Sequence, residues 1–514
     1  MDTIQTSSIA ALLERGDPGA SAIGAPDGVP SLRYRDLVGL AHRTVERLNA
    51  LGIGRGDRVA IVLANGPEAA TAFVCMAAGA TTAPLNPSYR ADEYRFYLGD
   101  LGARALVVEG GVDSPARRAA RELSIPIIEL HPCREQGAGT FTLEPLGPVR
   151  GAARRGGFGD AGDTALVLHT SGTTARPKIV PLLQRNVLSS ARHIATTLAL
   201  GPGDVCLNVM PLFHIHGLMA GTLASLAAGA QVACCPHFSA LRFFAWLDEV
   251  RPTWYTAVPT MHQALLARAA RHPDACARSR LRLVRSSSAR LPATVMKELE
   301  RVFKAPVLES YGMTETAHQI ASNPMPPARR EAGSVGSAAG PEVAIMDEGG
   351  RLLESGETGE IVVRGPNVMS GYENNPDANA HAFSDGWFRT GDQGSLDAGG
   401  YLGITGRLKE LINRGGEKIS PSEVDEVLMH HPGVHQAVTF AVPHPALGEE
   451  VAAAVVLHDG GTANDHELKA FAAEHLAHFK VPRRILFVRE IPKGPTGKVQ
   501  RIGLAAALGI APGG

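Results

Sequence analysis

The run His169-Thr-Ser-Gly-Thr-Thr-Ala-Arg-Pro-Lys178 follows directly after the apolar segment Thr164-Ala-Leu-Val-Leu168. Small hydroxyl and glycine positions let backbone N–H and side-chain O–H groups surround phosphate oxygens, and Lys178 adds a positive charge. A polar surface turn has a similar composition, but here the run is packed between a β-like segment and a basic residue. The stretch therefore predicts a strand that ends in a phosphate-binding loop, without the spacing of a P-loop.

Short β-like segments alternate with helix-like segments on both sides of this loop. The segment Arg58-Val-Ala-Ile-Val-Leu63, for example, precedes the helix-like Pro67-Glu-Ala-Ala-Thr-Ala-Phe-Val-Cys-Met76. That alternation is typical of α/β folds, in which helices cover a sheet. Further strands are predicted at Ala105–Val108, Thr164–Leu168, Val232–Cys235 and Trp254–Val258.

The pattern changes twice further along the chain. Residues 333–406 consist of short strands and turns, including strands at Gly359–Arg364 and Gly399–Ile404, and predict a β-rich subdomain. Residues 130–163 are rich in Gly, Arg and Pro and predict a connecting loop. After residue 406 the helices Pro421–Met429 and Glu467–Leu476 alternate with strands near Ala437–Val442 and Val451–Leu457. We therefore expect an α/β chain with a large N-terminal domain of αβ-sandwich lobes, a β-rich subdomain, and a small mobile α+β C-terminal domain.

Length, composition and charge restrict the class of protein. The chain has 514 residues, 44% of them hydrophobic, and a formal net charge of -1, which excludes a bulk attraction to nucleic acid. The six cysteines show no C-x-x-C spacing, so neither a disulfide framework nor a zinc site is expected. No membrane span, secretory signal or peroxisomal tripeptide is visible, and a cytoplasmic location is the expectation.

Three other short motifs carry groups suited to nucleotide chemistry. Tyr311-Gly-Met-Thr-Glu315 offers a ring for a base, a hydroxyl for phosphate and a carboxylate for Mg²⁺. In Trp387-Phe-Arg-Thr-Gly-Asp392 the aspartate can accept from two ribose hydroxyls, although a turn-capping role is common for such a residue. Pro492-Lys-Gly-Pro-Thr-Gly-Lys498, followed by Arg501, places a lysine on a loop from which it can enter and leave a site.

Together and in this order, the four motifs make the chain resemble the adenylate-forming superfamily, which includes acyl-CoA synthetases, luciferases and peptide-synthetase adenylation domains. The resemblance runs from Tyr34 to Arg501. It is closest to the oxalate–CoA ligase group. The segments that indicate this group are Pro211-Leu-Phe-His-Ile-His216, Thr253-Trp-Tyr-Thr-Ala-Val-Pro-Thr260, Ser286-Ser-Ser288, and His318 with Ser322-Asn-Pro324.

The resemblance implies an ATP-dependent carboxylate–CoA ligase that works through an acyl-adenylate and uses ATP, Mg²⁺ and coenzyme A. It implies that Lys498 bridges the acid and the α-phosphate, Thr314 contacts the α-phosphate, and Glu315 binds Mg²⁺. Asp392 and Arg407 would hold the ribose, and Tyr311 the adenine. The remaining nucleotide- and CoA-binding positions that the resemblance implies are Ser171, Gly172, Thr173, Thr174, Lys178, Ser288, Ala289, Gly312, Gly415 and Gly416. Ala175 and Ile179 depart from the usual family loop.

The resemblance also implies a division into residues 1–408, which bind ATP and acid, and residues 409–514, which form a mobile lid. Lys409 would be the hinge about which the lid rotates between adenylation and thioester formation. A small carboxylic acid is the expected partner, and the chain is expected to be a monomer or a homodimer.

For the acid, the resemblance places His214, Ser286, Ser288 and His318 at the acyl end of the site, with His214 also implied as a catalytic residue or a gate. Because an alkyl or aryl pocket would leave these donors unpaired, a small dicarboxylate such as oxalate is favoured. A fatty or 4-coumarate-type acid, a carrier-protein partner, luciferase-type oxygenation and a catalytically inactive nucleotide-binding homologue remain alternatives.

Overall fold

The computed structural model describes residues 8–147, 151–170, 177–492 and 499–510. Within the chain, two compact units are distinguished. The first consists of Met1–Thr170, Lys178–Val343 and Val363–Phe388, and the second of Ser171–Pro177, Ala344–Val362 and Arg389–Gly514. The phosphate-loop residues Ser171 to Thr174 and the loop lysine Lys498 lie outside the described residues.

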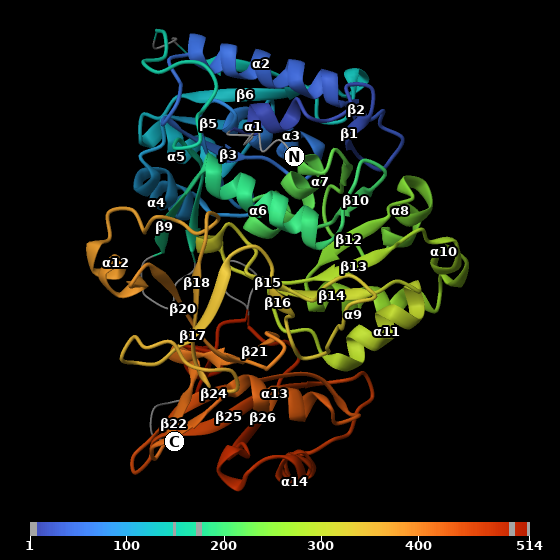
Figure 1. Cartoon of the computed structure of the whole chain (residues 1–514), viewed down its shortest axis with the longest axis vertical. Helices are drawn as coiled ribbons and strands as arrows, with labels where there is room; N and C mark the ends of the chain where they lie inside the picture. Colours follow the sequence, from blue (N-terminus) through green and yellow to red (C-terminus); the bar gives the residue numbers. More distant parts are fainter. Residues whose placement is uncertain (1–7, 148–150, 171–176, 493–498, 511–514) are drawn as a thin grey trace. The chain divides into compact units, whose positions relative to one another are not determined.

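A seven-stranded sheet in the first unit has the order β7-β6-β5-β3-β4-β8-β9 (Figure 1). Its strands are β3 (Arg58–Val62), β4 (Thr81–Pro84), β5 (Ala105–Glu109), β6 (Ile127–Pro132), β7 (Phe141–Leu146), β8 (Thr164–Thr170) and β9 (Lys178–Leu183). The helices α4 (Ala91–Leu101) and α5 (Pro115–Glu122) bury Leu98 and Ala119 against one face of it. Other helices in this part are α1 (Ile9–Leu13), α2 (Tyr34–Ala50) and α3 (Pro67–Ala77), and η1 (Arg134–Gln136) is a short 3₁₀ turn.

The expectation of a loop over residues 130–163 is wrong in one part, because β7 lies within it and pairs antiparallel with β6. Phe141 and Leu143 are buried, while Thr142 and Glu144 on the opposite side are exposed. The strand is short and lies at the edge of the sheet, between turns rich in glycine and arginine. Its two buried residues are too few to stand out from that composition as a sequence pattern.

A nine-stranded sheet in the same unit has the order β16-β15-β14-β13-β12-β10-β11-β1-β2. Its strands are β1 (Ser21–Gly24), β2 (Leu32–Arg33), β10 (Val205–Asn208), β11 (Gln231–Cys234), β12 (Trp254–Ala257), β13 (Leu283–Ser286), β14 (Val307–Tyr311), β15 (Ala321–Ser322) and β16 (Ser337–Ala338). The helices of this part are α6 (Gln184–Thr197), η2 (His216–Leu223), α7 (Ala224–Ala227), α8 (Phe243–Val250), α9 (Pro259–Ala269), α10 (Pro273–Arg278) and α11 (Ala293–Phe303).

The two faces of this sheet carry different side chains. Helices α8 to α11 pack on one face, where Tyr255, Val284 and Val307 join their apolar residues in a single core (Figure 1). Because successive residues of a strand point to opposite faces, Thr256 and Arg285 point to the other face. That face is contacted by η2, an eight-residue π-helix. A polar cluster can therefore form on the side of the sheet opposite the apolar core.

The β-rich part expected between residues 333 and 406 is present. It contains β17 (Glu342–Met346), β18 (Gly359–Arg364), α12 (Pro376–Ala382), β19 (Phe383–Ser384), β20 (Trp387–Leu396) and β21 (Leu402–Arg407). Strands β20 and β21 pair antiparallel, with Asp392 opposite Arg407. The 3₁₀ turn η4 (Leu408–Glu410) follows.

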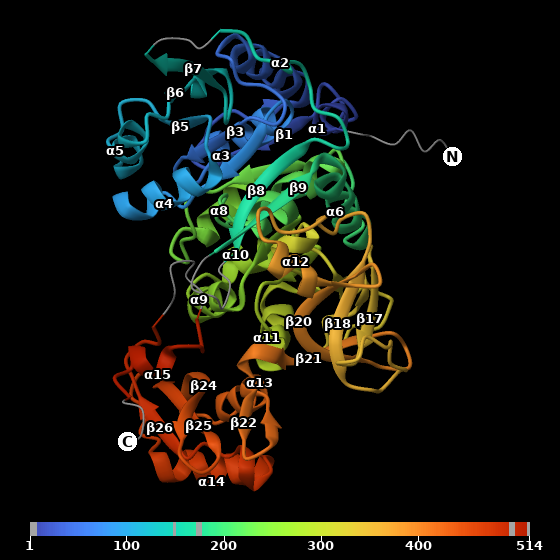
Figure 2. The same ribbon diagram turned by 90° about the vertical axis from the view of Figure 1, so that its left-hand side faces the viewer.

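The remaining residues of the second unit form a sheet of order β23-β22-β25-β24, with β26 beside β25 (Figure 2). Its elements are β22 (Ile412–Arg414), β23 (Glu417–Ile419), α13 (Pro421–Met429), β24 (Val434–His444), β25 (Gly448–Leu457), α14 (Asp465–His475), η5 (His478–Lys480), β26 (Arg484–Phe487) and α15 (Leu504–Ala507). In β25, Val451 and Ala453 pack with α13 and α14, whereas Ala452 and Ala454 pack with Leu504 of α15. This alternation confirms the predicted α+β character of the segment.

Candidate active site

Lys178 begins β9 and pairs with Thr170, the last residue of β8. These two residues bracket the predicted phosphate loop, so the predicted strand before it is confirmed, while the loop itself stays a prediction. The loop residues Ser171, Gly172 and Thr173 lie outside the described residues, and with them Thr174. The Lys178 ammonium lies 4.3 Å from the centre of the Tyr372 ring. This cation–π contact holds the lysine stem at the start of β9.

The predicted adenine and phosphate residues lie where β14 ends. Tyr311 is the last residue of β14, and η3 (Thr314–Thr316) begins three residues later with a half-buried Thr314. Gly312 between them is required for a steric reason, because a Cβ there would lie 1.3 Å from the carbonyl oxygen of His318. Any larger residue would therefore push the two segments apart.

Glu315 is buried, with only 5% of its surface exposed. Its Oε1 accepts a hydrogen bond of 2.9 Å from the Tyr372 hydroxyl. A buried carboxylate is costly unless it is hydrogen-bonded or bound to a cation. Glu315 therefore suits the role of an Mg²⁺ ligand, which typically needs only one or two carboxylates besides the nucleotide phosphates. Among the residues that the structure describes, no cluster of three or more His, Cys, Asp or Glu side chains could hold a metal by itself.

A buried polar cluster surrounds Arg285 on β13. Arg285 and Thr256 are register partners on adjacent parallel strands, and Arg285 is 0% exposed. Its Nη1 lies 3.1 Å from His318 Nε2 and 3.4 Å from His216 Nε2. Its Nη2 lies 3.4 Å from Gln319 Oε1. Burial lowers the pKa of Arg285 to about 9, because a charged group without a counter-ion is disfavoured in a medium of low dielectric constant.

The two histidines of this cluster contact each other and the serine triplet. Their rings stack with centroids 4.8 Å apart. His216 Nδ1 lies 3.0 Å from Ser288 Oγ, and His216 Nε2 lies 2.6 Å from Thr256 Oγ1. His318 has a backbone φ of 96° and Ser288 one of 71°, conformations that are costly for these residues. The fold therefore holds both side chains in this cluster against local backbone preference.

The structure brings two of the four predicted acid-site residues into this cluster, namely Ser288 and His318. Ser286 is fully buried at the end of β13, and its Oγ has no hydrogen-bond partner among the described residues. Ala289 is exposed in the turn that follows. His214 is half-buried and its ring lies 4.6 Å from that of Phe213. The gate and catalytic roles expected of His214 stay predictions.

The second unit positions the predicted ribose residues on a β-hairpin. Asp392 is 5% exposed, and its Oδ1 lies 2.9 Å from Arg407 Nε on the neighbouring strand. Gly415 and Gly416 have φ values of 60° and 98° and connect β22 to β23. Positive φ at both central positions is what a type I′ two-residue hairpin turn requires, so the turn itself accounts for these glycines. Lys409 is exposed in η4.

Next to η4, Arg501 is largely buried in an ion-pair network of the second unit. Its Nη2 lies 2.7 Å from Asp425 Oδ2, and its Nε lies 3.3 Å from Glu410 Oε2. Arg501 follows the predicted catalytic Lys498 by three residues, and Glu410 follows Lys409. Arg501 thus connects the chain just after the Lys498 loop to Glu410, the residue that follows the predicted hinge Lys409.

Sequence reasoning assigned no role to Arg285, His216 or Tyr372. One signal was available for Arg285, which is the only charged residue inside the apolar strand Leu283-Val-Arg-Ser286. His216 belongs to the segment Pro211–His216, which indicates the oxalate–CoA ligase group, but within it only His214 is predicted to have a role. Nothing local distinguishes Tyr372, because its partner Glu315 is 57 residues away along the chain.

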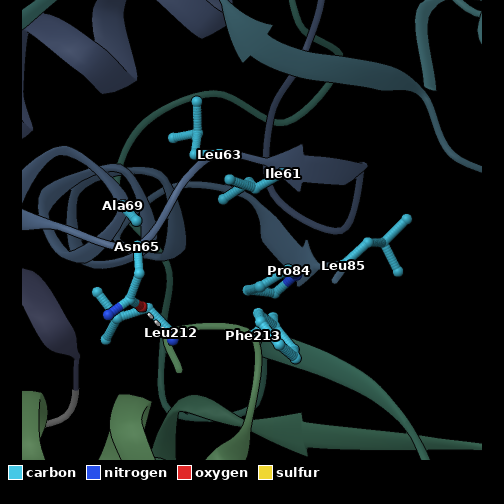
Figure 3. Close-up of a pocket in the computed structure, with 8 residues that line it drawn as sticks. All are labelled: Ile61, Leu63, Asn65, Ala69, Pro84, Leu85, Leu212 and Phe213. Atoms are coloured by element: carbon cyan, nitrogen blue, oxygen red, sulfur yellow. Dashed lines mark hydrogen bonds between the residues drawn. The ribbon is translucent and has the colours of Figure 1, made fainter. Parts of the chain in front are cut away.

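A separate small pocket lies at the ends of β3 and β4 (Figure 3). It is lined by Ile61, Leu63, Asn65, Ala69, Pro84, Leu85, Leu212 and Phe213. Asn65 closes one side by accepting from the Leu212 N–H at 2.8 Å and donating to the Cys235 carbonyl at 2.8 Å. The lining contains none of the predicted site residues, although Phe213 precedes His214 in the chain.

Comparison with known proteins decides the family. A model for AMP-binding enzymes matches residues 14–373, and one for the C-terminal domain of AMP-binding enzymes matches residues 423–498. The chain belongs to the AMP-binding enzyme family. It is 43% identical to an oxalate–CoA ligase of Arabidopsis thaliana, with 98% of each chain covered. It is 39% identical to an oxalate–CoA ligase of Saccharomyces cerevisiae, with 93% of each chain covered, and 36% identical to a sulfoacetate–CoA ligase of Cupriavidus necator, again with 93% of each covered.

Solved structures of the family confirm the fold. The ATP-bound structure of MatB from Rhodopseudomonas palustris superposes with a TM-score of 0.86 at 31% identity, covering 97% of this chain and 98% of that one. MenE from Bacillus subtilis in complex with ATP and a magnesium ion gives a TM-score of 0.82 at 29% identity, covering 97% and 99%. The predicted α/β class and the predicted enzyme class, an AMP-forming acid–thiol ligase, are therefore confirmed. Among the described residues, no helix is long and apolar enough to cross a membrane.

Proposed function

We propose that the chain is an acid–CoA ligase for small acids with a second anionic group, with oxalate as the first candidate. The observation that carries the proposal is the buried cluster of Arg285, His216 and His318. It holds the buried guanidinium of Arg285, which contacts both histidine rings and pairs with none of the carboxylates of the described residues. The relatives support this choice, since two are named for oxalate and one for sulfoacetate.

The first half-reaction joins two anions. A carboxylate oxygen of the acid attacks the α-phosphorus of ATP, the bond to the β-phosphate oxygen breaks, and pyrophosphate leaves with the electron pair. Positioning and electrostatic stabilisation supply the catalysis, because the protein forms no covalent bond. Lys498 screens the meeting anions, and Lys178, with the hydroxyl and N–H groups of residues 171–174, holds the leaving phosphates.

Other residues hold the nucleotide in this proposal. Glu315 is the carboxylate ligand of Mg²⁺, which supplies charge neutralisation when it is bound with ATP. Tyr311 stacks on the adenine and Thr314 contacts the α-phosphate. The ribose hydroxyls donate to Asp392, whose ion pair with Arg407 orients its carboxylate.

In the second half-reaction the CoA thiol attacks the carbonyl carbon of the adenylate, and AMP leaves with the bonding electron pair. The thiol proton is lost to solvent or to a base. Lys498 cannot stay at that carbonyl while the thiol enters, so residues 409–514 rotate about Lys409 as a mobile lid on the N-terminal domain of residues 1–408. The segment of Gly415 and Gly416 then lines the path of the pantetheine arm.

At the acid end, the energetic argument concerns the charge of Arg285. Its two Nη atoms have hydrogen-bond partners, but its buried Nε has none among the described residues, and the guanidinium pairs with none of their carboxylates. A second anionic group on the acid offsets that buried charge at short range, whereas an alkyl or aryl group does not. This difference favours oxalate over a monocarboxylate of similar size.

The cytoplasmic location and a monomeric or homodimeric state are kept as predictions.

The test is a panel of acids assayed for AMP release with CoA present. Oxalate, malonate and sulfoacetate represent dianionic acids, and acetate, hexanoate and 4-coumarate represent acids with one charge. We expect kcat/KM for oxalate to exceed that for acetate by at least about tenfold, the factor that about 1.4 kcal/mol produces. A chain that prefers hexanoate or 4-coumarate would contradict the proposed acid and leave only the ligase class standing.

A further inference from the structure

The cluster around Arg285 contains three basic groups but can hold only one positive charge. The guanidinium of Arg285 contacts both ring nitrogens named above, and the two rings stack on each other. Like charges at such distances in a buried site repel strongly. Since the guanidinium keeps its proton even with its pKa lowered to about 9, both imidazoles must be the neutral partners.

Hydrogen-bond chemistry then fixes which nitrogen carries the proton. A guanidinium has donors only, so the His318 Nε2 atom at 3.1 Å must accept from it. His216 Nε2 lies 2.6 Å from the Thr256 hydroxyl, which donates to its single lone pair, and the Arg285 N–H at 3.4 Å disfavours a proton on this nitrogen. Each neutral ring therefore carries its proton on Nδ1. His216 Nδ1–H consequently donates to Ser288 Oγ at 3.0 Å, which leaves the serine O–H free to donate elsewhere.

We propose that Arg285 is a positioning residue of the acid site. It fixes His216 and His318 as neutral Nδ1–H tautomers, and through His216 it orients the Ser288 hydroxyl toward an anionic acid. The inference rests on the proposed function, because it names Arg285 as the residue that orients the other side chains of the proposed acid site. Arg285 acts through its neighbours and supplies the single charge of the cluster.

Among the residues that the structure describes, the other titratable groups around Arg285 supply no competing charge. Cys206 on β10 is buried, which raises the pKa of its thiol, and His262 on α9 is buried, which lowers its pKa to about 3. Both are therefore neutral near pH 7. Glu309 on β14 is the register partner of Ser286, so it points to the opposite face of the sheet, where its Oε1 accepts from the Leu291 N–H at 2.8 Å.

The main experiment compares Arg285→Met with Arg282→Met in the full-length chain. Arg282 lies just before the same strand and is paired with Asp204 at 2.6 Å, so its loss removes an arginine that has a carboxylate partner. Arg285→Met should lower kcat/KM for oxalate about 10- to 100-fold, as expected for loss of a charged hydrogen-bonding group, and change kcat/KM for acetate by less than about threefold. Arg282→Met should leave the oxalate-to-acetate ratio unchanged.

The pH profile gives a readout that a merely structural role would not change. In Arg285→Met the repulsion from the guanidinium is gone, so one of the two stacked imidazoles can take up a proton as the pH falls. Protonation restores one positive charge, so kcat/KM for oxalate in this variant should rise as the pH falls from about 8 to about 6. The parent enzyme should show no such rise. A parallel profile in the two proteins would overturn the inference.

Two further variants keep the test decisive if Arg285→Met does not fold. Arg285→Lys retains the charge but cannot reach both ring nitrogens, so it should retain part of the oxalate preference. His318→Gln keeps a neutral acceptor for Arg285 and cannot titrate, so it should lose less than about tenfold in oxalate kcat/KM. A larger loss would show that a charged imidazole is needed. If the parent itself does not prefer oxalate, the proposed acid fails, and the same variants and pH profiles, run with the accepted acid, test the inference separately.

Discussion

Tyr372→Phe tests the buried contact that holds Glu315. The Tyr372 hydroxyl donates to Glu315 Oε1 over 2.9 Å, and a hydrogen bond to a charged group contributes about 1.5–3 kcal/mol. Phenylalanine removes that bond but keeps the ring, so the Lys178 ammonium at 4.3 Å keeps its cation–π contact. Loss of the group that orients a carboxylate ligand should raise the Mg²⁺ concentration for half-maximal adenylation about 10- to 100-fold.

The assay is pyrophosphate–ATP isotope exchange at fixed ATP and acid across an Mg²⁺ titration, with KM for the acid measured at saturating Mg²⁺. Tyr94→Phe is the matched control, because its hydroxyl donates over 2.8 Å to the neutral Asn86 carbonyl in the core beside the seven-stranded sheet. The control should cost about 1 kcal/mol of stability without moving the Mg²⁺ titration. An unchanged titration in Tyr372→Phe, or an equal shift in Tyr94→Phe, would refute the reasoning.

Three other predictions concern the lysine, the hinge and an ion pair. Lys498→Ala should abolish adenylation yet leave most CoA transfer from a supplied acyl-adenylate, since the cation is needed where two anions meet; equal loss of both half-reactions would contradict this role. Lys409→Pro fixes one backbone torsion and should impair thioester formation more than adenylation, and equal losses would place the hinge elsewhere. Burial raises the pKa of Asp204, but hydrogen bonds and the charge of Arg282 outweigh it and lower that pKa. Asp204→Asn should therefore reduce the unfolding free energy by about 1–3 kcal/mol at neutral pH, a deficit that disappears as the pH falls below the unfolded value of about 3.9 and through the lower folded pKa. Denaturation at neutral and acid pH measures it, and a pH-independent deficit would be evidence against the ion pair.

Local sequence patterns determined the elements whose signals are contained in a few consecutive residues. The helix predicted at Pro421–Met429 has those bounds in the structure, and the strand predicted at Gly359–Arg364 likewise. In the first case proline at the first helical position and an apolar period of three to four residues carry the information. The second contains the continuous apolar run Ile361 to Val363 and is bounded by glycine and arginine. The strand at residues 399–404 was placed too early, because Gly399 and Gly400 form the turn and β21 begins at Leu402.

For the site, the sequence by itself determined the motifs, the family and two side chains of the Arg285 cluster, Ser288 and His318, because those residues occur as short runs with recognisable chemistry. Only the tertiary structure decided that Arg285 meets His216, 69 residues earlier, and His318, 33 residues later. Strand register and the π-helix η2 bring these groups together, and neither leaves a periodic pattern in the chain. Burial then decides their charge, since removal from water makes one arginine and two neutral imidazoles more stable than any arrangement with two positive charges.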